Sequence, residues 1–261
     1  MNFDEINKKP YLMGIWAMII CAAAVIIAAQ ISYTVPVGGG VFNLTGLFVV
    51  LFTVIPSISF ITMMLKKEEK MEEEFVKKHY SKAFWQRHEK DLMIMLFYFV
   101  GLTLAFSVWS FMLPPEFFQV QTQKINEIQG VTGAASYKYY SFTQILNNNL
   151  QVMFFAFLFS LVFGAGAIFI IAWNASILGV YIGELASSLW HIPVVSLAFL
   201  PHGLPEIGAY LIAGIAGGLL SAMLIRKNTI HIKEVVAFDC LKLLMVACVL
   251  IVIAAGIEVY L

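Results

Sequence analysis

The chain has 261 residues, of which 61% are hydrophobic and 12% are charged, and its formal net charge is zero. With a mean hydropathy of +0.86, this composition excludes an ordinary soluble domain and indicates a membrane protein. The sequence contains no nucleic-acid motif, phosphate-binding glycine loop or HExxH helix, so we expect no nucleic-acid partner and no cofactor. Its cysteines lie in apolar runs without CxxC spacing and say nothing about redox compartment: Cys21, Cys240 and Cys248.

The first 65 residues predict an N-terminal transmembrane hairpin. Two lysines precede an apolar run over 12–35. This run is too long for the core of a signal peptide, although the small residues Ala28-Ala29 leave open a signal-peptide cleavage site. A short loop with three consecutive glycines follows, and a second apolar run covers about 44–65.

A highly charged segment over 66–91 comes next. Its Glu73 and Lys77 stand at the i,i+4 spacing that supports a helix, so we expect a cytoplasmic helical connection. A third apolar run covers 92–113, and a polar connection follows over 114–148. Four apolar side chains in that connection suggest an amphipathic helix on the outer membrane surface: Phe117, Phe118, Ile125 and Ile128.

The rest of the chain is almost continuously apolar. Pro193 is expected to end a helix near Trp190, which would leave 194–200 as a re-entrant piece. The sequence therefore predicts an all-α polytopic bundle of about seven spans, or six if 174–200 is re-entrant, with a five-span core over 92–261. Four runs of the core are long enough to cross about 30 Å of hydrocarbon: about 149–173, 174–200, 205–225 and 237–258.

Charge placement predicts the orientation. With seven spans and the N-terminus inside, fourteen of the sixteen Lys and Arg residues fall on the cytoplasmic side. Only Lys124 and Lys138 fall outside, in agreement with the positive-inside rule. We therefore expect a multi-pass protein of the cell membrane, surrounded by the lipid bilayer.

The segment Leu200-Pro201-His202-Gly203-Leu204-Pro205-Glu206 is predicted to be a turn. Its prolines and glycine are expected to prevent a regular helix before Pro205, which puts Glu206 in the first turn of the next helix. The predicted orientation brings this turn to the outer face together with two other polar features. We call this set the outer polar cluster: Asn147, Asn148, Asn149, His202, Glu206 and Glu258.

Two interpretations of the outer polar cluster stay open. In one, the side chains form a hydrogen-bonded knot, in which Glu206 caps free N–H groups and His202 bridges to Glu258 or the asparagines. In the other, His202, Glu206 and Glu258 form a proton-relay site or bind a metal such as zinc or manganese. No nucleophile is paired with a base, so no catalytic residue is predicted.

A second polar feature, the intramembrane stripe, follows the predicted helix 174–191. Glu184 would lie near mid-membrane, where an ionised carboxylate costs on the order of 3 kcal/mol. It should therefore face the bundle interior, find a partner or be protonated. The stripe is either a proton or ion path or a neutral glutamate hydrogen-bonded between helices, and its members are Asn174, Tyr181, Glu184, Ser188 and His191.

Small residues predict close helix packing in the last four spans. Two pairs have the GxxxG spacing that lets helix backbones approach one another, in a tight bundle or at a dimer face. The glycines concerned are Gly164, Gly179, Gly183, Gly214 and Gly218.

Several of these residues form a longer pattern: Asn147-Asn148-Asn149-Leu150, Phe163-Gly164, Asn174, Gly179, Leu-Pro-His-Gly-x-x-Glu at 200–206, Ala213-Gly214 and Ile257-Glu258. From about residue 92 to the end, the chain resembles the stage II sporulation protein M family of multi-span membrane proteins. In spore formers the resemblance implies a non-catalytic anchor that gathers cell-wall-degrading partners at the septum. The 1–65 hairpin is extra relative to the five-span form.

From these features we expect a non-enzymatic membrane scaffold of the cell envelope. It would act through envelope protein partners or as a homo-oligomer such as a dimer. One alternative is a transporter or channel with a polar path along 174–191 that ends at the outer polar cluster. The third is an intramembrane hydrolase.

Overall fold

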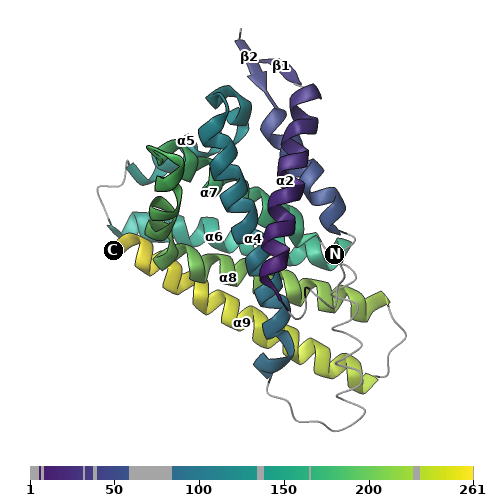
Figure 1. Ribbon diagram of the computed structural model, residues 1–261. Helices are drawn as coiled ribbons and strands as arrows, with labels where there is room; N and C mark the ends of the chain where they lie inside the picture. Colours follow the sequence, from purple (N-terminus) through teal and green to yellow (C-terminus); the bar gives the residue numbers. More distant parts are fainter. Residues whose placement is uncertain are drawn as a thin grey trace. The chain divides into compact units, whose positions relative to one another are not determined.

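The computed structural model describes residue 6 and residues 9–31, 33–37, 40–58, 84–133, 138–164, 166–225 and 230–260. Within these ranges the chain is mostly long helices joined by short connections (Figure 1). The predicted cytoplasmic connection over 66–91 falls largely outside the described residues.

The N-terminal part contains a helix, a strand pair and a second helix. Helix α2 (Tyr11–Ile31) leads into the antiparallel strands β1 (Thr34–Val37) and β2 (Gly40–Asn43). The sequence predicted only a loop here. The β-branched and aromatic residues on either side of the glycines favour the extended pair that forms instead. The side chain of Asn43 accepts the N–H of Thr45 at 2.8 Å, and the apolar helix Thr45–Ile58 begins at that point.

The third predicted span and the outer connection fold as three consecutive helices. Helix α4 covers Phe84–Met112, a 3-10 turn η1 covers Pro115–Phe118, and α5 covers Gln119–Gly133. Pro115 opens η1, because proline suits a first helical turn whose N–H groups have no acceptor.

Helices α6 (Lys138–Phe163) and α7 (Ala167–Leu185) correct the predicted spans 149–173 and 174–200. The chain turns at Gly164, whose φ of +73° is a conformation that favours glycine. The hydroxyl of Ser160 accepts the N–H of Ala167 at 2.9 Å and so caps the start of α7. The turn contains no polar side chain, so the hydropathy of 149–200 gave no sign of it.

The predicted turn at 200–206 is wrong. After a short 3-10 turn, η2 (Leu189–His191), helix α8 runs from Ile192 to Ile225 with Pro201 and Pro205 inside it. Each proline removes one backbone hydrogen bond without ending the helix. In apolar surroundings a non-helical segment would leave many more backbone groups unpaired, which favours continuation. Residues 194–200 are helical as part of α8, and the re-entrant interpretation of this piece stays a prediction.

The last helix, α9, covers Ile230–Tyr260. The helix Thr45–Ile58 is apolar but shorter than a span, and the residues after it are not described. The predicted all-α polytopic bundle is confirmed, because six of the described helices are long and apolar enough to cross a membrane. They are Tyr11–Ile31, Glu89–Met112, Phe142–Phe163, Ala167–Leu185, Leu189–Ile225 and Lys233–Tyr260.

The chain divides into two compact units built from non-consecutive segments. Unit 1 comprises Met1–Ile55, Phe97–Ser141 and Ala172–Leu200. Unit 2 comprises Pro56–Leu96, Phe142–Ile171 and Pro201–Leu261. The domain boundaries expected near residues 65 and 91 stay a prediction.

Glycines bring helix backbones close together inside unit 1. A Cβ at Gly101 of α4 would overlap the backbone of Gly14 in α2. On α7, a Cβ at Gly179 would lie 2.6 Å from the carbonyl oxygen of Thr103, and one at Gly183 would lie 2.6 Å from that of Ser107. These glycines fit their helices against one another with no room for a side chain.

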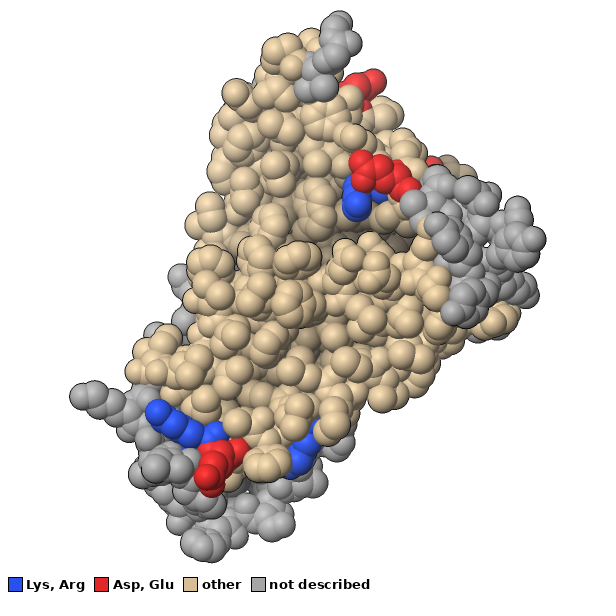
Figure 2. All heavy atoms as spheres, turned by 180° about the vertical axis from the view of Figure 1, so that it is seen from behind, with Lys and Arg blue, Asp and Glu red and all other residues tan. Residues whose placement is uncertain are grey.

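Glycines also allow close helix packing inside unit 2. A Cβ at Gly214 of α8 would lie 2.6 Å from Cβ of Ala167, and a Cβ at Gly217 would overlap the carbonyl oxygen of Phe157 in α6. Gly218, the other member of the predicted pair, is also buried. On the face drawn in Figure 2, most of the described surface carries no Lys, Arg, Asp or Glu, as expected for helices surrounded by lipid.

Candidate functional site

The carboxylate of Glu206 is hydrogen-bonded within its own helix. Tyr210 lies one turn further along α8, and its hydroxyl donates to Oε1 of Glu206 at 2.7 Å. Tyr210 is 1% exposed and Glu206 is half-buried. Sequence reasoning missed Tyr210, although the i,i+4 spacing of a phenol and a carboxylate on a helix was a usable signal.

Two more members of the outer polar cluster interact with this pair. Glu258, near the end of α9, interacts electrostatically with Glu206. It also interacts electrostatically with His202, one turn before Glu206. The structure thus brings His202, Glu206 and Glu258 into one region of unit 2, joined there by Tyr210.

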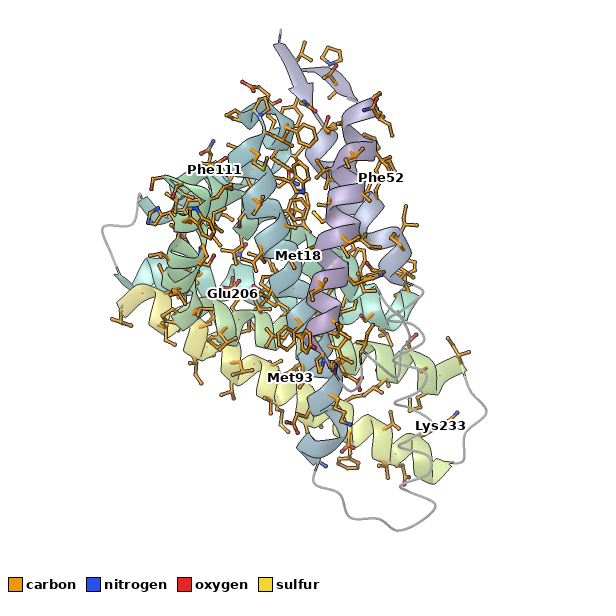
Figure 3. All side chains as sticks on the ribbon, viewed as in Figure 1. Met18, Phe52, Met93, Phe111, Glu206 and Lys233 are labelled. Carbon is orange, nitrogen blue, oxygen red and sulfur yellow. The ribbon has the colours of Figure 1, made fainter. Side chains whose placement is uncertain are left out.

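The packing of α8 against α9 explains this meeting. The thiol of Cys240 donates to the carbonyl oxygen of Ala216 at 3.3 Å. Further along, Leu250 would lie 3.7 Å from a Cβ at Gly208. Residue numbers rise along α9 as they fall along α8, so the two helices are antiparallel. This register makes Glu258 level with the residues near Pro201, where the unit 2 part of α8 begins. Glu206 and Lys233, near the start of α9, accordingly lie far apart in Figure 3.

Helix α6 brings Asn149 to the level of Glu206. Figure 1 shows α6 and the unit 2 part of α8 running in the same direction, with α9 returning in the other. Ser160 of α6 packs against Gly217 of α8, because a Cβ added at Gly217 would lie 2.9 Å from the Cβ of Ser160. Asn149 precedes Ser160 by eleven residues, and Glu206 precedes Gly217 by the same number. Equal steps along parallel helices place Asn149 and Glu206 level with each other.

The three asparagines differ in their surroundings. Asn149 is buried and 4% exposed, whereas Asn147 and Asn148 are exposed. The amide of Asn148 donates to Oδ1 of Asn149 at 3.2 Å. The described residues contain no group of three or more His, Cys, Asp or Glu side chains that could hold a metal ion. The metal interpretation of His202, Glu206 and Glu258 therefore gains no support.

The predicted intramembrane stripe does not lie on one helix. Asn174, Tyr181 and Glu184 lie on α7, which ends at Leu185, whereas Ser188 is the N-cap residue of the η2 turn and His191 ends that turn. Glu184 is at the end of its helix instead of the middle, because α7 begins at residue 167 and not 174. It is exposed and accepts a 2.7 Å hydrogen bond from the hydroxyl of Thr122 in α5.

The other stripe residues have local contacts. The ring of Tyr181 meets that of Phe199 edge to face, with 5.5 Å between centroids. Nδ1 of His191 accepts the N–H of Ser187 at 3.2 Å and so closes the connection between α7 and α8. Asn174 is half-buried.

A second polar site, which sequence reasoning missed, holds α5 on unit 1. Gln121 of α5 is fully buried, and its amide donates to the carbonyl oxygen of Gly46 at 3.0 Å and to Ser176 of α7 at 3.4 Å. Two residues earlier, Oε1 of Gln119 accepts the N–H of Asn43 at 2.7 Å. The only signal in the sequence was a run of glutamines in a polar helix, which does not single out a buried one.

These helices, with their apolar surfaces and their few internally paired polar groups, define a multi-pass integral membrane protein. The chain belongs to the stage II sporulation protein M family, whose model matches residues 17–261. This match begins in the first span, well before the resemblance predicted from residue 92.

One relative is an uncharacterized protein of Methanocaldococcus jannaschii. It is 35% identical over 125 residues, which cover 46% of this chain and 70% of the relative. No solved structure matches the chain.

Proposed function

We propose that this protein is a non-enzymatic scaffold of the cell envelope that presents a fixed polar layer, η1 and α5, to protein partners. The observation that carries the proposal is the hydrogen bond from Thr122 to Glu184. A carboxylate expected to line a path through the membrane instead anchors α5 at the end of α7. A scaffold needs such a fixed layer, whereas a transporter needs polar groups that continue along the span.

Several contacts support a rigid layer. Gln119 joins α5 to β2, and Gln121 joins it to the helix Thr45–Ile58 and to α7. The ring of Phe118 in η1 packs against Phe106 of α4, with 5.9 Å between centroids. Three elements therefore hold α5, and α4 holds the η1 turn that precedes it.

The free side of α5 is polar. Gln123, Asn126 and Glu127 are exposed, and Lys124 pairs with Glu127 at 3.1 Å. On the orientation predicted from the Lys and Arg distribution, this side faces the exterior, where envelope partners or a second copy of the chain would meet it.

Affinity capture tests the scaffold directly. Full-length tagged protein is cross-linked in cells and the captured proteins are identified. We expect Asn126→Arg, on the free side of α5, to reduce capture of the specific partners or of a second copy. The matched control is Thr34→Arg, also an exposed position. Equal capture by wild type and Asn126→Arg would contradict α5 as the docking layer.

A flux assay separates the scaffold from the transporter. The full-length protein is reconstituted in liposomes, and proton and potassium flux are measured for wild type and Glu184→Gln. The scaffold predicts no protein-dependent flux in either sample. Flux that the substitution alters would establish the path and end the scaffold proposal.

A further inference from the structure

Two buried polar atoms at one end of unit 2 have no hydrogen-bond partner. Nδ2 of Asn149 lacks an acceptor, and Oε1 of Gln144 lacks a donor. Both residues lie near the start of the part of α6 that belongs to unit 2. This part of α6 is level with His202 and Glu206 of α8. Buried polar groups are almost always paired in native proteins, so the unpaired N–H of Asn149 points to a missing acceptor.

Asn149 points toward α8. It belongs to a buried stripe of α6 with Met153, Ala156 and Ser160, at the i, i+4, i+7 and i+11 positions of one helix face. Ser160 contacts the Gly217 position of α8, so this face of α6 is the one that packs on α8. On α8, Glu206 lies eleven residues before Gly217 and thus on the same side as that glycine. The amide of Asn149 and the carboxylate of Glu206 therefore lie on facing sides of the two helices.

Open space adjoins this end of α8 and α9. A Cβ at Gly203 or at Gly256 would have no atom within 4 Å. The antiparallel register that makes Leu250 level with Gly208 makes Gly256 nearly level with Gly203. Both glycines stand next to cluster members, Gly203 after His202 and Gly256 two residues before Glu258.

The charges of the cluster do not balance. Glu206 and Glu258 supply two carboxylates, and His202 supplies at most one positive charge. The described lysines of α9, Lys233 and Lys242, precede Glu258 by 25 and 16 residues, about 37 and 24 Å along the helix. They are too far away to compensate it. A carboxylate in apolar surroundings is either protonated or paired with a cation that donates hydrogen bonds to it.

We propose that this end of unit 2 binds a primary ammonium group with an oxygen acceptor a few bonds away. The ammonium lies between the carboxylates of Glu206 and Glu258 and donates to both. The acceptor oxygen takes the free N–H of Asn149. Both the ethanolamine headgroup of a phospholipid and a small soluble amino alcohol phosphate have this chemistry. The inference does not depend on the scaffold proposal.

Calorimetric titration of the full-length protein in an amine-free detergent buffer tests the chemistry. The probe is glycerophosphoethanolamine, and the control is glycerophosphocholine, which has the same charges but no N–H on its nitrogen. We expect the ethanolamine compound to bind at least about tenfold more tightly, since the hydrogen bonds to the carboxylates need N–H donors. Equal binding of the two compounds would overturn the proposal.

Substitutions locate the site. Glu206→Gln and Asn149→Leu should each weaken binding of glycerophosphoethanolamine by about tenfold or more, because each removes a charged or hydrogen-bonded contact. The matched control is Asn148→Leu, the exposed neighbour, which should bind as wild type does. Gly256→Leu fills the open space without changing a polar group and should also block binding. Wild-type affinity in all three site variants would place the ligand elsewhere and overturn the assignment.

Nanodiscs distinguish the two sources of the ligand. The melting temperature of the full-length protein is compared in phosphatidylethanolamine and phosphatidylcholine discs. Stabilisation by ethanolamine lipid that Asn149→Leu abolishes identifies a lipid headgroup. Binding of the soluble compound without lipid dependence identifies a soluble ligand. If neither occurs, the proposal fails, and a proton alone neutralises the cluster. The choline comparison on the wild type decides the question even if a variant does not fold.

Discussion

Tyr210 donates a 2.7 Å hydrogen bond to the carboxylate of Glu206, one turn away on the same helix. The pair lies just after Pro205, inside a continuous helix that passes through two prolines. The polar segment 200–206 is therefore part of a helix with an internal side-chain contact and not a turn. The side chains that interact there come from α8 and α9.

Removing the Tyr210 hydroxyl should destabilise the protein. Tyr210→Phe leaves the half-buried carboxylate of Glu206 without its donor, at a cost of about 1–3 kcal/mol. Denaturant unfolding in detergent, followed by circular dichroism, measures the change in the free energy of unfolding. Tyr33→Phe, at an exposed tyrosine, is the control and should change it by less than about 0.5 kcal/mol. Equal effects of the two substitutions would show that the hydrogen bond contributes nothing specific.

A methyl group at Gly46 should disrupt the attachment of α5. The added Cβ would overlap Oε1 of Gln121 and lie 3.1 Å from Cα of Phe118, so Gly46→Ala should cost about 1–3 kcal/mol through overpacking. Gly203→Ala places the same methyl in open space inside a helix and should be neutral or slightly stabilising. Thermal melts of both variants in detergent give the comparison. The reverse order of melting temperatures would refute the packing described for Gly46.

The amide of Gln121 should matter more than the neighbouring hydroxyl of Thr122. Gln121→Leu removes a buried donor from the carbonyl oxygen of Gly46 and should cost about 1–3 kcal/mol. Thr122→Val breaks a hydrogen bond at an exposed site and should cost less than about 1 kcal/mol. Limited proteolysis adds a local readout, since loosening of α5 should speed cleavage within 119–133. Unchanged proteolysis in Gln121→Leu would argue against a fixed layer.

The cap at the start of α7 offers a third local test. Ser160→Ala removes the acceptor for the N–H of Ala167 and should cost about 0.5–2 kcal/mol. Ser196→Ala is the control. Its hydroxyl donates at 2.8 Å to the carbonyl of Ile192, which also belongs to the helix ladder, so its loss should change little. Hydrogen exchange at residues 167–170 should increase only in Ser160→Ala, and unchanged exchange there would disprove the cap.

Composition and hydropathy predicted the class of fold, because lipid solubility is a property of whole segments. They did not locate the turn at Gly164, which joins two helices without a polar residue. They also misjudged Pro201 and Pro205, because proline ends helices in water far more readily than in apolar surroundings, where every backbone group left outside a helix is costly. The second error came from a rule calibrated on soluble proteins.

The site residues were predictable to different degrees. Glu206 and Glu258 stand out because carboxylates are rare in apolar helices. Gln121 could not be singled out, since its importance depends on which neighbour lies opposite, and helix register is a property of packing. Tyr210 could have been found from its i,i+4 spacing to Glu206 on one helix. Glu184 was placed at mid-membrane only because the start of its helix was put seven residues too late.

The account depends most on the facing of Asn149 and Glu206 across α6 and α8. The direct measurement is cysteine cross-linking in native membranes with a short bis-maleimide, after Cys21, Cys240 and Cys248 have been replaced by alanine. The account predicts that Asn149→Cys cross-links with Glu206→Cys, whereas Asn148→Cys, on the exposed side of α6, does not. A cross-link from position 148 and none from position 149 would contradict it.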